Sequence, residues 1–153
     1  MDSVVTSKSR LRLWLRVLKL SRLIENELRE RFRKEFNSTL PRFDVLASLE
    51  RHSDGLRMSE LSTVLRVSNG NVTGIVDRLV EEGLVVRVAV PGDRRASLVK
   101  LTDDGRSQFA LQAEAHERWI NELLAMFPEE QAELLAKQLE LGLPFGKALG
   151  EQV

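Results

Sequence analysis

The chain has 153 residues, enough for one domain with a substantial core, and its 42% hydrophobic and 30% charged residues are typical of a globular protein. No apolar run approaches membrane-spanning length, and the basic N-terminus leads into an amphipathic segment rather than a signal peptide, so we expect a cytoplasmic protein without membrane contact. The absence of cysteine excludes disulfides, thiolate metal sites and thiol-based redox sensing.

Charge is unevenly distributed along the chain, although the formal net charge is zero. Residues 1–100 carry 19 Lys and Arg against 13 Asp and Glu, whereas residues 101–153 carry 4 against 10. One part of the molecule is therefore basic and the other acidic. Taken alone, the basic part is as consistent with an ordinary solvated surface as with a nucleic-acid-binding one.

Residues 9–36 are expected to form one long helix with two apolar stripes. The stripes are Leu11, Trp14, Leu15 and Leu18, and Leu13, Val17, Leu20, Ile24 and Leu28. A helix packed on a single partner needs only one stripe, so we expect this helix to contact its own domain and a second copy of the chain. Its basic cluster fits a phosphate contact, a phosphorylated effector or a plain charged face, and interleaved glutamates favour the last. The cluster is Arg29, Arg31, Arg33 and Lys34.

Three shorter helices are expected next. Pro41 is tolerated in a first helical turn, and that helix ends near Gly55. A second helix runs from about Met58 to Leu65. Ser68 is a good N-cap for a third over residues 69–82, and Gly83 is placed to end it as a C′ residue.

A β-hairpin follows these helices. Residues 84–90 are rich in valine, residues 98–101 form a second short apolar run, and Pro91 and Gly92 supply the turn between them. Thr102 is a plausible N-cap for a helix that runs to about Phe127, with Asp103 and Asp104 in its first turn at the positive end of the helix dipole. Pro128 opens a final helix. The predicted fold is mostly α, an α+β winged helix flanked by N- and C-terminal helices.

Two short helices with a tight connection, followed by a hairpin, are typical of a winged helix-turn-helix, in which the second helix enters the major groove of DNA. The exposed residues near the start of this helix are Asn69, Gly70, Asn71, Thr73 and Gly74. Asparagine pairs with adenine, threonine offers a methyl group to thymine, and glycine lets the backbone approach closely. By itself this run is an ordinary polar helix start; its place between a capped helix and an arginine-tipped hairpin favours DNA binding.

The hairpin tip carries Asp93, Arg94 and Arg95. A guanidinium on a thin stalk suits the narrow, negative minor groove of A·T-rich DNA, and a second arginine suits the adjacent phosphates. Because a lone carboxylate would repel DNA, we expect Asp93 to turn inward and orient an arginine through a charge-assisted pair. The alternative is a solvated polar turn in which Asp93 only forms the turn.

These residues resemble the MarR family of bacterial winged helix-turn-helix regulators over essentially the whole chain. The resemblance rests on "LSTVLRVSNGNVTGIVDRLVEEGLVVR", on Asp93 and Arg95 as D-x-R, and on the closing "KLT" before a long helix. It implies a single domain over residues 1–153, with dimerisation helices at about 9–36 and 103–142 and a DNA-binding part at about 41–102.

The same resemblance implies roles for single residues. Arg95 would enter the minor groove and Asp93 would brace the wing. Asp77 would pair with wing or helix arginines, and Arg78 would contact phosphate or that brace. DNA contacts would extend from Ser68 along the recognition helix. Family members usually carry a larger polar or basic residue where this chain has Gly74. The resemblance therefore does not specify which bases are contacted at this position.

The resemblance also implies a homodimer on a pseudo-palindrome of double-stranded DNA, and a repressor released by a small effector, an aromatic carboxylate or an aryl-coenzyme A thioester. Whether such a regulator represses or activates is not fixed by the sequence. Candidate effector contacts are Trp14, Leu18, Arg42, Phe43 and Trp119. The alternative, that these residues form an ordinary core, is favoured by their composition.

An enzyme is a poor alternative, because His52 and His116 lie in no metal or triad pattern and no phosphate-binding glycine loop is present. We therefore expect no cofactor and no metal site. A winged-helix protein-interaction module without DNA binding is a more serious alternative, but such modules lose the exposed basic wing that Arg94 and Arg95 form here.

Overall fold

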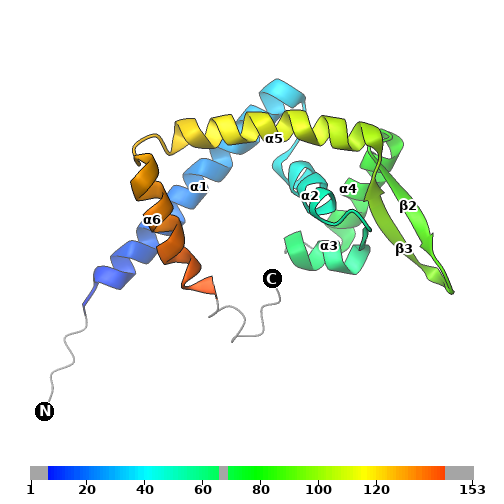
Figure 1. Ribbon diagram of the computed structural model, residues 1–153, viewed down its shortest axis with the longest axis horizontal. Helices are drawn as coiled ribbons and strands as arrows, with labels where there is room; N and C mark the ends of the chain where they lie inside the picture. Colours follow the sequence, from blue (N-terminus) through cyan, green and yellow to red (C-terminus); the bar gives the residue numbers. More distant parts are fainter. Residues whose placement is uncertain (1–6, 66–68, 144–153) are drawn as a thin grey trace, which may run out of the picture.

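A computed structural model of the chain describes residues 7–65 and 69–143 (Figure 1). The first four helices and a short strand lead into a hairpin, and two helices close the fold. In chain order the elements are α1 (Ser9–Phe36), α2 (Leu40–Arg51), β1 (Leu56–Arg57), α3 (Met58–Leu65), α4 (Asn69–Glu81), β2 (Val85–Val90), β3 (Asp93–Leu101), α5 (Asp103–Leu123) and α6 (Glu129–Glu140).

One end of the molecule holds α2, α3, α4 and the sheet, packed around their own core (Figure 1). The antiparallel sheet has the order β1-β3-β2, so β3 is central. Pairing runs from Val85 opposite Leu101 to Ala89 opposite Ser97, and β1 joins with Leu56 opposite Val99. Fully buried Val45, Leu61, Val72, Val76 and Leu79 fill the space between the three helices. The burial of one apolar stripe on each helix stabilises this winged helix.

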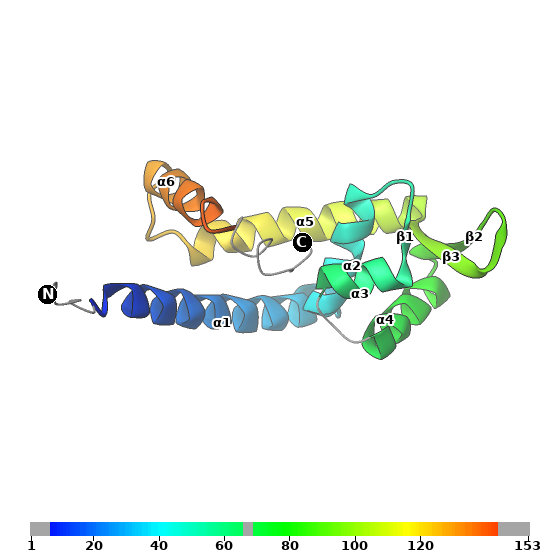
Figure 2. The same ribbon diagram turned by 90° about the horizontal axis from the view of Figure 1, so that it is seen from below.

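The long helices α1 and α5 form a second layer and lie side by side along the molecule (Figure 2). Their common core contains Leu28, Phe32, Phe43, Ala115 and Trp119. The rings of Phe32 and Trp119 meet edge-on with centroids 5.0 Å apart, a favourable aromatic geometry. Because Phe43 belongs to α2, this second core attaches the winged helix to the layer formed by α1 and α5.

Several local predictions are confirmed. Pro41 lies in the first turn of α2, as expected. Thr39 was not singled out from the sequence; its hydroxyl caps this helix by accepting a hydrogen bond from the backbone N–H of Arg42. Gly83 has φ of 73°, the left-handed conformation expected after the end of α4. Thr102 caps α5 by accepting a bond from the N–H of Gly105. The predicted fold class, a mostly helical winged helix with flanking helices, is also confirmed.

One unpredicted strand and two element boundaries differ from the prediction. Strand β1 was not expected, because two residues are too few to show a periodic pattern; its pairing with β3 defines it. Strand β3 begins at Asp93 rather than Leu98, since pairing with β2 continues to the turn. Helix α5 ends at Leu123, before Phe127, whose N–H bonds to the carbonyl of Leu124 in a turn.

The predicted N-cap Ser68 lies outside the described residues. Among the helices that the structure describes, none combines the length and apolar character needed to cross a bilayer.

Candidate nucleic-acid interface

Helix α4 turns one face inward and leaves the other in solvent. Val72, Val76 and Leu79 are fully buried, so the 3.6-residue period places Asn71 and Arg78 on the outer side, where both are exposed. Thr73, Gly74 and Asp77 are exposed as well. Asn69 and Gly70 belong to the first turn of the helix. The structure therefore places the polar residues Asn71 and Thr73, which the sequence analysis expected to be exposed, on the outer face of α4.

Gly74 lies in the middle of this outer face. A Cβ atom added at Gly74 would have no heavy atom within 4 Å, so nothing inside the protein requires a glycine there. Glycine in a helix interior costs about 1 kcal/mol relative to alanine. The position is thus open to a partner approaching from outside.

The wing is the β2–β3 hairpin, which projects from the same end of the molecule as α4 (Figure 2). Its register shifts between Ala89 and Val90, and Gly92 at the turn has φ of 83°. Arg94 and Arg95 are exposed, and no carboxylate within residues 7–65 and 69–143 pairs with either guanidinium. Both cations are therefore available to an external anion.

The predicted pairing of Asp93 with an arginine side chain is wrong in this structure. The Asp93 Oδ1 atom accepts a hydrogen bond of 3.0 Å from the backbone N–H of Arg95. An aspartate that bonds the backbone two residues ahead stabilises a turn, so Asp93 shapes the tip.

Asp77 connects the helix to the wing. Its Oδ1 atom accepts a hydrogen bond of 2.5 Å from the guanidinium of Arg87 in β2. Sequence reasoning proposed an arginine partner for Asp77 but did not single out Arg87. The available signal was strand alternation, which sets Arg87 on the same face as buried Val85, toward α4.

The wing root is held by hydrogen bonds around Thr102. The Thr102 hydroxyl donates to the carbonyl of Gly83 at 2.7 Å, and its backbone N–H donates to the carbonyl of Leu84 at 3.1 Å. The hydroxyl also accepts from the N–H of Gly105. One threonine thus joins the end of α4, the start of β2 and the first turn of α5.

Arg42 connects the α1–α2 turn to the other end of α4. Its Nε atom donates to the buried Ser38 hydroxyl, and its guanidinium forms an ion pair with Glu82, just past the last residue of α4. A carboxylate near a helix C-terminus is repelled by the helix dipole, and the ion pair with Arg42 offsets this repulsion for Glu82. Residues 40 positions apart in the sequence meet here, and no local pattern signals the pair.

The predicted effector set does not come together. Trp14 lies in the N-terminal half of α1 and is 55% exposed, whereas Phe43 and Trp119 are buried in the second core. Leu18 is half-buried on α1, away from these rings. The reason is that Trp14 and Phe32 share one helix, and only its C-terminal half packs against α5.

A different hollow, of about 550 Å³, opens between the C-terminal end of α1, the start of α2 and α4. Its lining includes Arg29, Arg33, Leu40, Pro41, Asn71 and Ile75. Apolar walls with a few charged groups are typical of small-molecule sites, and this volume lies in their usual range. Arg42 lines a neighbouring hollow of about 360 Å³ with Gly74 and Arg78.

The basic cluster of α1 is mostly paired within the helix. Arg31 contacts Glu27 and, at 2.6 Å, Glu122 of α5. Both Arg33 and Lys34 pair with Glu30, and Arg33 lowers the pKa of that carboxyl through its hydrogen bond. The interpretation as a charged helix face, favoured by the interleaved glutamates, fits these pairs.

Two half-buried titratable groups, one in α5 and one in α2, have shifted pKa values. Burial lowers the pKa of His116, whose ring packs 4.8 Å from that of Phe43. Burial also raises the pKa of Asp44 in α2, and the nearby Glu25 raises it further. In the part of the chain that is described, no group of three or more His, Asp or Glu side chains is placed to hold a metal ion.

Known proteins share this architecture and part of the sequence. A model of the MarR family matches residues 37–96. The multiple antibiotic resistance protein MarR of Escherichia coli is 38% identical over 104 residues, which cover 64% of this chain and 72% of that protein.

Solved structures extend the likeness over most of the chain. A MarR family transcriptional regulator from Silicibacter pomeroyi is 34% identical with a TM-score of 0.74, covering 93% of this chain and 98% of that one. A mutant MarR from E. coli, solved in complex with operator DNA, is 27% identical with a TM-score of 0.74, covering 90% and 97%.

Proposed function

Because the chain belongs to the MarR family of DNA-binding transcription regulators, which are not enzymes, we propose that it is a homodimeric repressor released from a pseudo-palindromic operator by a small aromatic acid or aryl-coenzyme A thioester. The observation that carries the proposal is the wing. Two exposed arginines, which pair with no carboxylate among the described residues, stand at the end of a hairpin that projects beside an exposed polar helix face.

In the proposed complex, α4 lies in the major groove. Asn71 reads a base edge with its amide, Thr73 offers its hydroxyl and methyl, and Arg78 contacts a phosphate. Arg95 enters the minor groove, where the potential is most negative over A·T-rich sequence, and Arg94 takes a flanking phosphate. The ion pair between Asp77 and Arg87 keeps helix and wing at a fixed spacing.

Helices left uncovered in the protomer support the homodimer. No residue of α6 is buried, and Leu134, Leu139 and Leu141 are between 58% and 81% exposed. An apolar helix face of this size is costly in water unless a partner covers it. A two-fold pair would place two α4 helices in successive major grooves, about one helical turn apart.

The effector is proposed to bind in the hollow lined by Arg29, Arg33 and Ile75. An aromatic ring would contact the apolar Leu40, Pro41 and Ile75, and a carboxylate would compete with Glu30 for Arg33. Asn71 of α4 borders the same hollow, so an effector bound there competes with the contact that Asn71 makes to DNA. The effector then binds the free protein more tightly than the DNA-bound protein, which is the requirement for release.

The DNA-binding proposal is tested by fluorescence anisotropy on DNA from upstream of the protein's own gene. We expect Arg95→Ala to weaken operator binding about tenfold, because one groove contact is lost, while the dimer stays intact. Arg118→Ala on α5 is the matched control and should bind as the wild type does. Unchanged affinity of the Arg95 variant would refute this account of the wing.

A protein-interaction module is distinguished by salt. A DNA-binding protein that neutralises several phosphates loses affinity steeply between low and moderate salt and still prefers its operator. No detectable binding to DNA at low salt would favour the interaction module. The effector is sought by adding aromatic acids and their coenzyme A thioesters to the complex, with Arg33→Ala as the variant expected to resist release.

A further inference from the structure

A polar hollow of about 330 Å³ lies where the end of α1, the start of α2, the end of α4 and the first half of α5 meet. Phe36 and Leu84 form the apolar part of its wall. The hollow shares only Ser38 with the one proposed for the aromatic effector, so the two are separate sites. Its polar lining residues are Asn37, Ser38, Arg42, Glu82, Gln108 and Gln112.

Gln112 of α5 is a buried member of this lining that lacks a partner. Only 3% of its surface is exposed, and its Oε1 atom has no hydrogen-bond partner among the residues that the structure describes. A buried acceptor without a donor is unfavourable, and most such groups in folded proteins bond to protein or to ordered water. One water takes about 30 Å³, so the hollow has room for a larger donor than a single water.

A second amide lies beside the first. Gln108 and Gln112 are four residues apart on α5, so their side chains leave the same face of the helix. Gln108 is half-buried and lines the same hollow. Each carboxamide has both donors and an acceptor, so together they can bind a small polar molecule from one side.

Another wall of the hollow carries one positive and one negative group. Arg42 forms an ion pair with Glu82, and its Nε atom donates a hydrogen bond of 3.2 Å to the buried Ser38 hydroxyl. Asn37 ends α1 in the left-handed conformation, with φ of 47°, and so directs the chain to Ser38. The side chains of Arg42 and Glu82 are 17% and 48% exposed, so small solutes can reach the pair.

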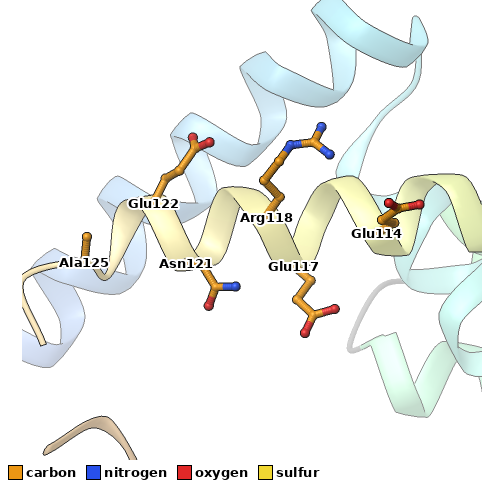
Figure 3. Close-up of a pocket in the computed structure, with 6 residues that line it drawn as sticks. All are labelled: Glu114, Glu117, Arg118, Asn121, Glu122 and Ala125. Atoms are coloured by element: carbon orange, nitrogen blue, oxygen red, sulfur yellow. The ribbon is translucent and has the colours of Figure 1, made fainter. Parts of the chain in front are cut away.

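A hollow farther along α5 lacks these features (Figure 3). Its six lining residues are all exposed. Arg118 and Glu122 point toward α1 and pair there with Glu35 and Arg31, at 3.7 and 2.6 Å. This second hollow therefore offers no buried polar group to a ligand, and its central charges already have partners.

The ion pair in the wall of the first hollow selects the charge of a ligand. A ligand with a single carboxylate could take Arg42 only by leaving Glu82 unpaired next to the C-terminus of α4, where the helix dipole repels it. A zwitterion replaces both partners at once, because its carboxylate pairs with Arg42 and its ammonium group with Glu82. An ammonium group has three N–H donors, so it can also supply the donor that the Gln112 Oε1 atom lacks.

We propose that this hollow binds a free amino acid, whose ammonium group bonds to Gln112 and Glu82 and whose carboxylate pairs with Arg42. The site goes beyond the proposed function, because its ligand is a zwitterion rather than DNA or a simple acid. Phe36 and Leu84 contact the side chain of the amino acid and favour an apolar one. Binding replaces the ion pair between α2 and the residue that follows α4, so it changes how the end of α4 is held.

The test is isothermal titration calorimetry of the full-length, DNA-free protein with the proteinogenic L-amino acids, one at a time. The N-acetyl derivative and the methyl ester of the amino acid that binds most tightly test the ammonium and carboxylate groups separately. Gln112→Leu removes the buried acceptor with little change in volume. Gln131→Leu, at an exposed glutamine of α6, is the matched control. Urea unfolding measures the stability of both variants.

We expect an amino acid to bind the wild type and Gln131→Leu equally well, and Gln112→Leu about tenfold or more weakly, because a hydrogen bond to a charged group is lost. Since the Gln112 Oε1 atom bonds to no described residue, Gln112→Leu should unfold at the same urea concentration as the wild type or a higher one. Each derivative should bind the wild type about tenfold or more weakly than the free amino acid.

The proposal is overturned if no amino acid binds the wild type, or if Gln112→Leu binds as tightly as the wild type does. A derivative that binds as tightly as the free amino acid would also contradict it, because the protein would then not recognise a zwitterion. The two derivatives are tested on the wild type, so this result does not depend on how well the variant folds. Because DNA is absent, a protein that binds DNA but no amino acid would refute this site and leave the proposed function standing.

Discussion

Replacing Gly105 with alanine should damage the junction between the wing and the helical layer. Gly105 is buried in the first turn of α5, and a Cβ atom there would lie 2.0 Å from the carbonyl oxygen of Leu84. Real Cβ atoms do not approach a backbone oxygen so closely. Neither the Cβ atom nor the carbonyl oxygen can move unless its own backbone moves. Helix α5 or the start of β2 must therefore move.

The loss in the free energy of unfolding can be estimated from the hydrogen bonds that this movement weakens. The Leu84 carbonyl accepts the N–H of Thr102, and the Thr102 hydroxyl donates to Gly83, so two hydrogen bonds weaken, at about 1 kcal/mol each. Overpacking adds about 1 to 3 kcal/mol. We expect the free energy of unfolding to fall by about 3 kcal/mol, a large fraction of the 5 to 15 kcal/mol typical of a domain.

Urea unfolding followed by circular dichroism, at one protein concentration for all variants, measures this loss. With a slope of about 1 to 3 kcal/mol per molar urea, the midpoint should fall by about 1 M or more. Gly74→Ala is the control, because its Cβ meets open space and should stabilise α4 by up to about 1 kcal/mol. A midpoint for Gly105→Ala within about 0.2 M of the wild type would show that the junction tolerates the methyl group and that the reasoning fails.

Three further outcomes are expected. Asn71→Ala should lower operator affinity about tenfold with little change on random DNA, measured by anisotropy; an equal loss on both would exclude base reading. Because burial lowers the pKa of His116, the unfolded chain binds more protons, so stability should fall as pH drops from 7 toward 5, and urea midpoints of His116→Gln should depend less on pH. Arg42→Gln and Glu82→Gln should show a coupling of about 0.5 kcal/mol in a double-mutant cycle, and additive effects would mean that the ion pair contributes nothing.

The sequence predicted those parts of the fold that depend on local chemistry. Thr102 caps α5 and Gly83 ends α4 in the left-handed conformation, because capping and helix termination depend on a few neighbouring residues. The exposed arginines of the wing and the polar outer face of α4 follow from periodicity in the same way. These features specify where the proposed DNA-binding surface lies.

Parts of the site that depend on distant residues were not predictable. The pairs Arg42–Glu82 and Arg87–Asp77 form only when separate elements pack, and the expected effector residues separated because α1 extends beyond its own core. The role of Asp93 was misjudged for a different reason. A carboxylate beside arginines suggests an ion pair, but the nearest donor in the turn is a backbone N–H.

The placement of β1 has a mechanical consequence for the wing. Its two residues pair with Leu98 and Val99 of β3, so the root of the hairpin is three strands wide and anchored to the core. Beyond Leu98 only two strands remain, and their register breaks at Ala89 and Val90. Two-stranded ribbons adopt a larger twist than wider sheets. The arginines thus lie on a two-stranded arm with a three-stranded base. In the proposed complex with DNA, such an arm would let the tip adjust to grooves of unequal width without displacing α4.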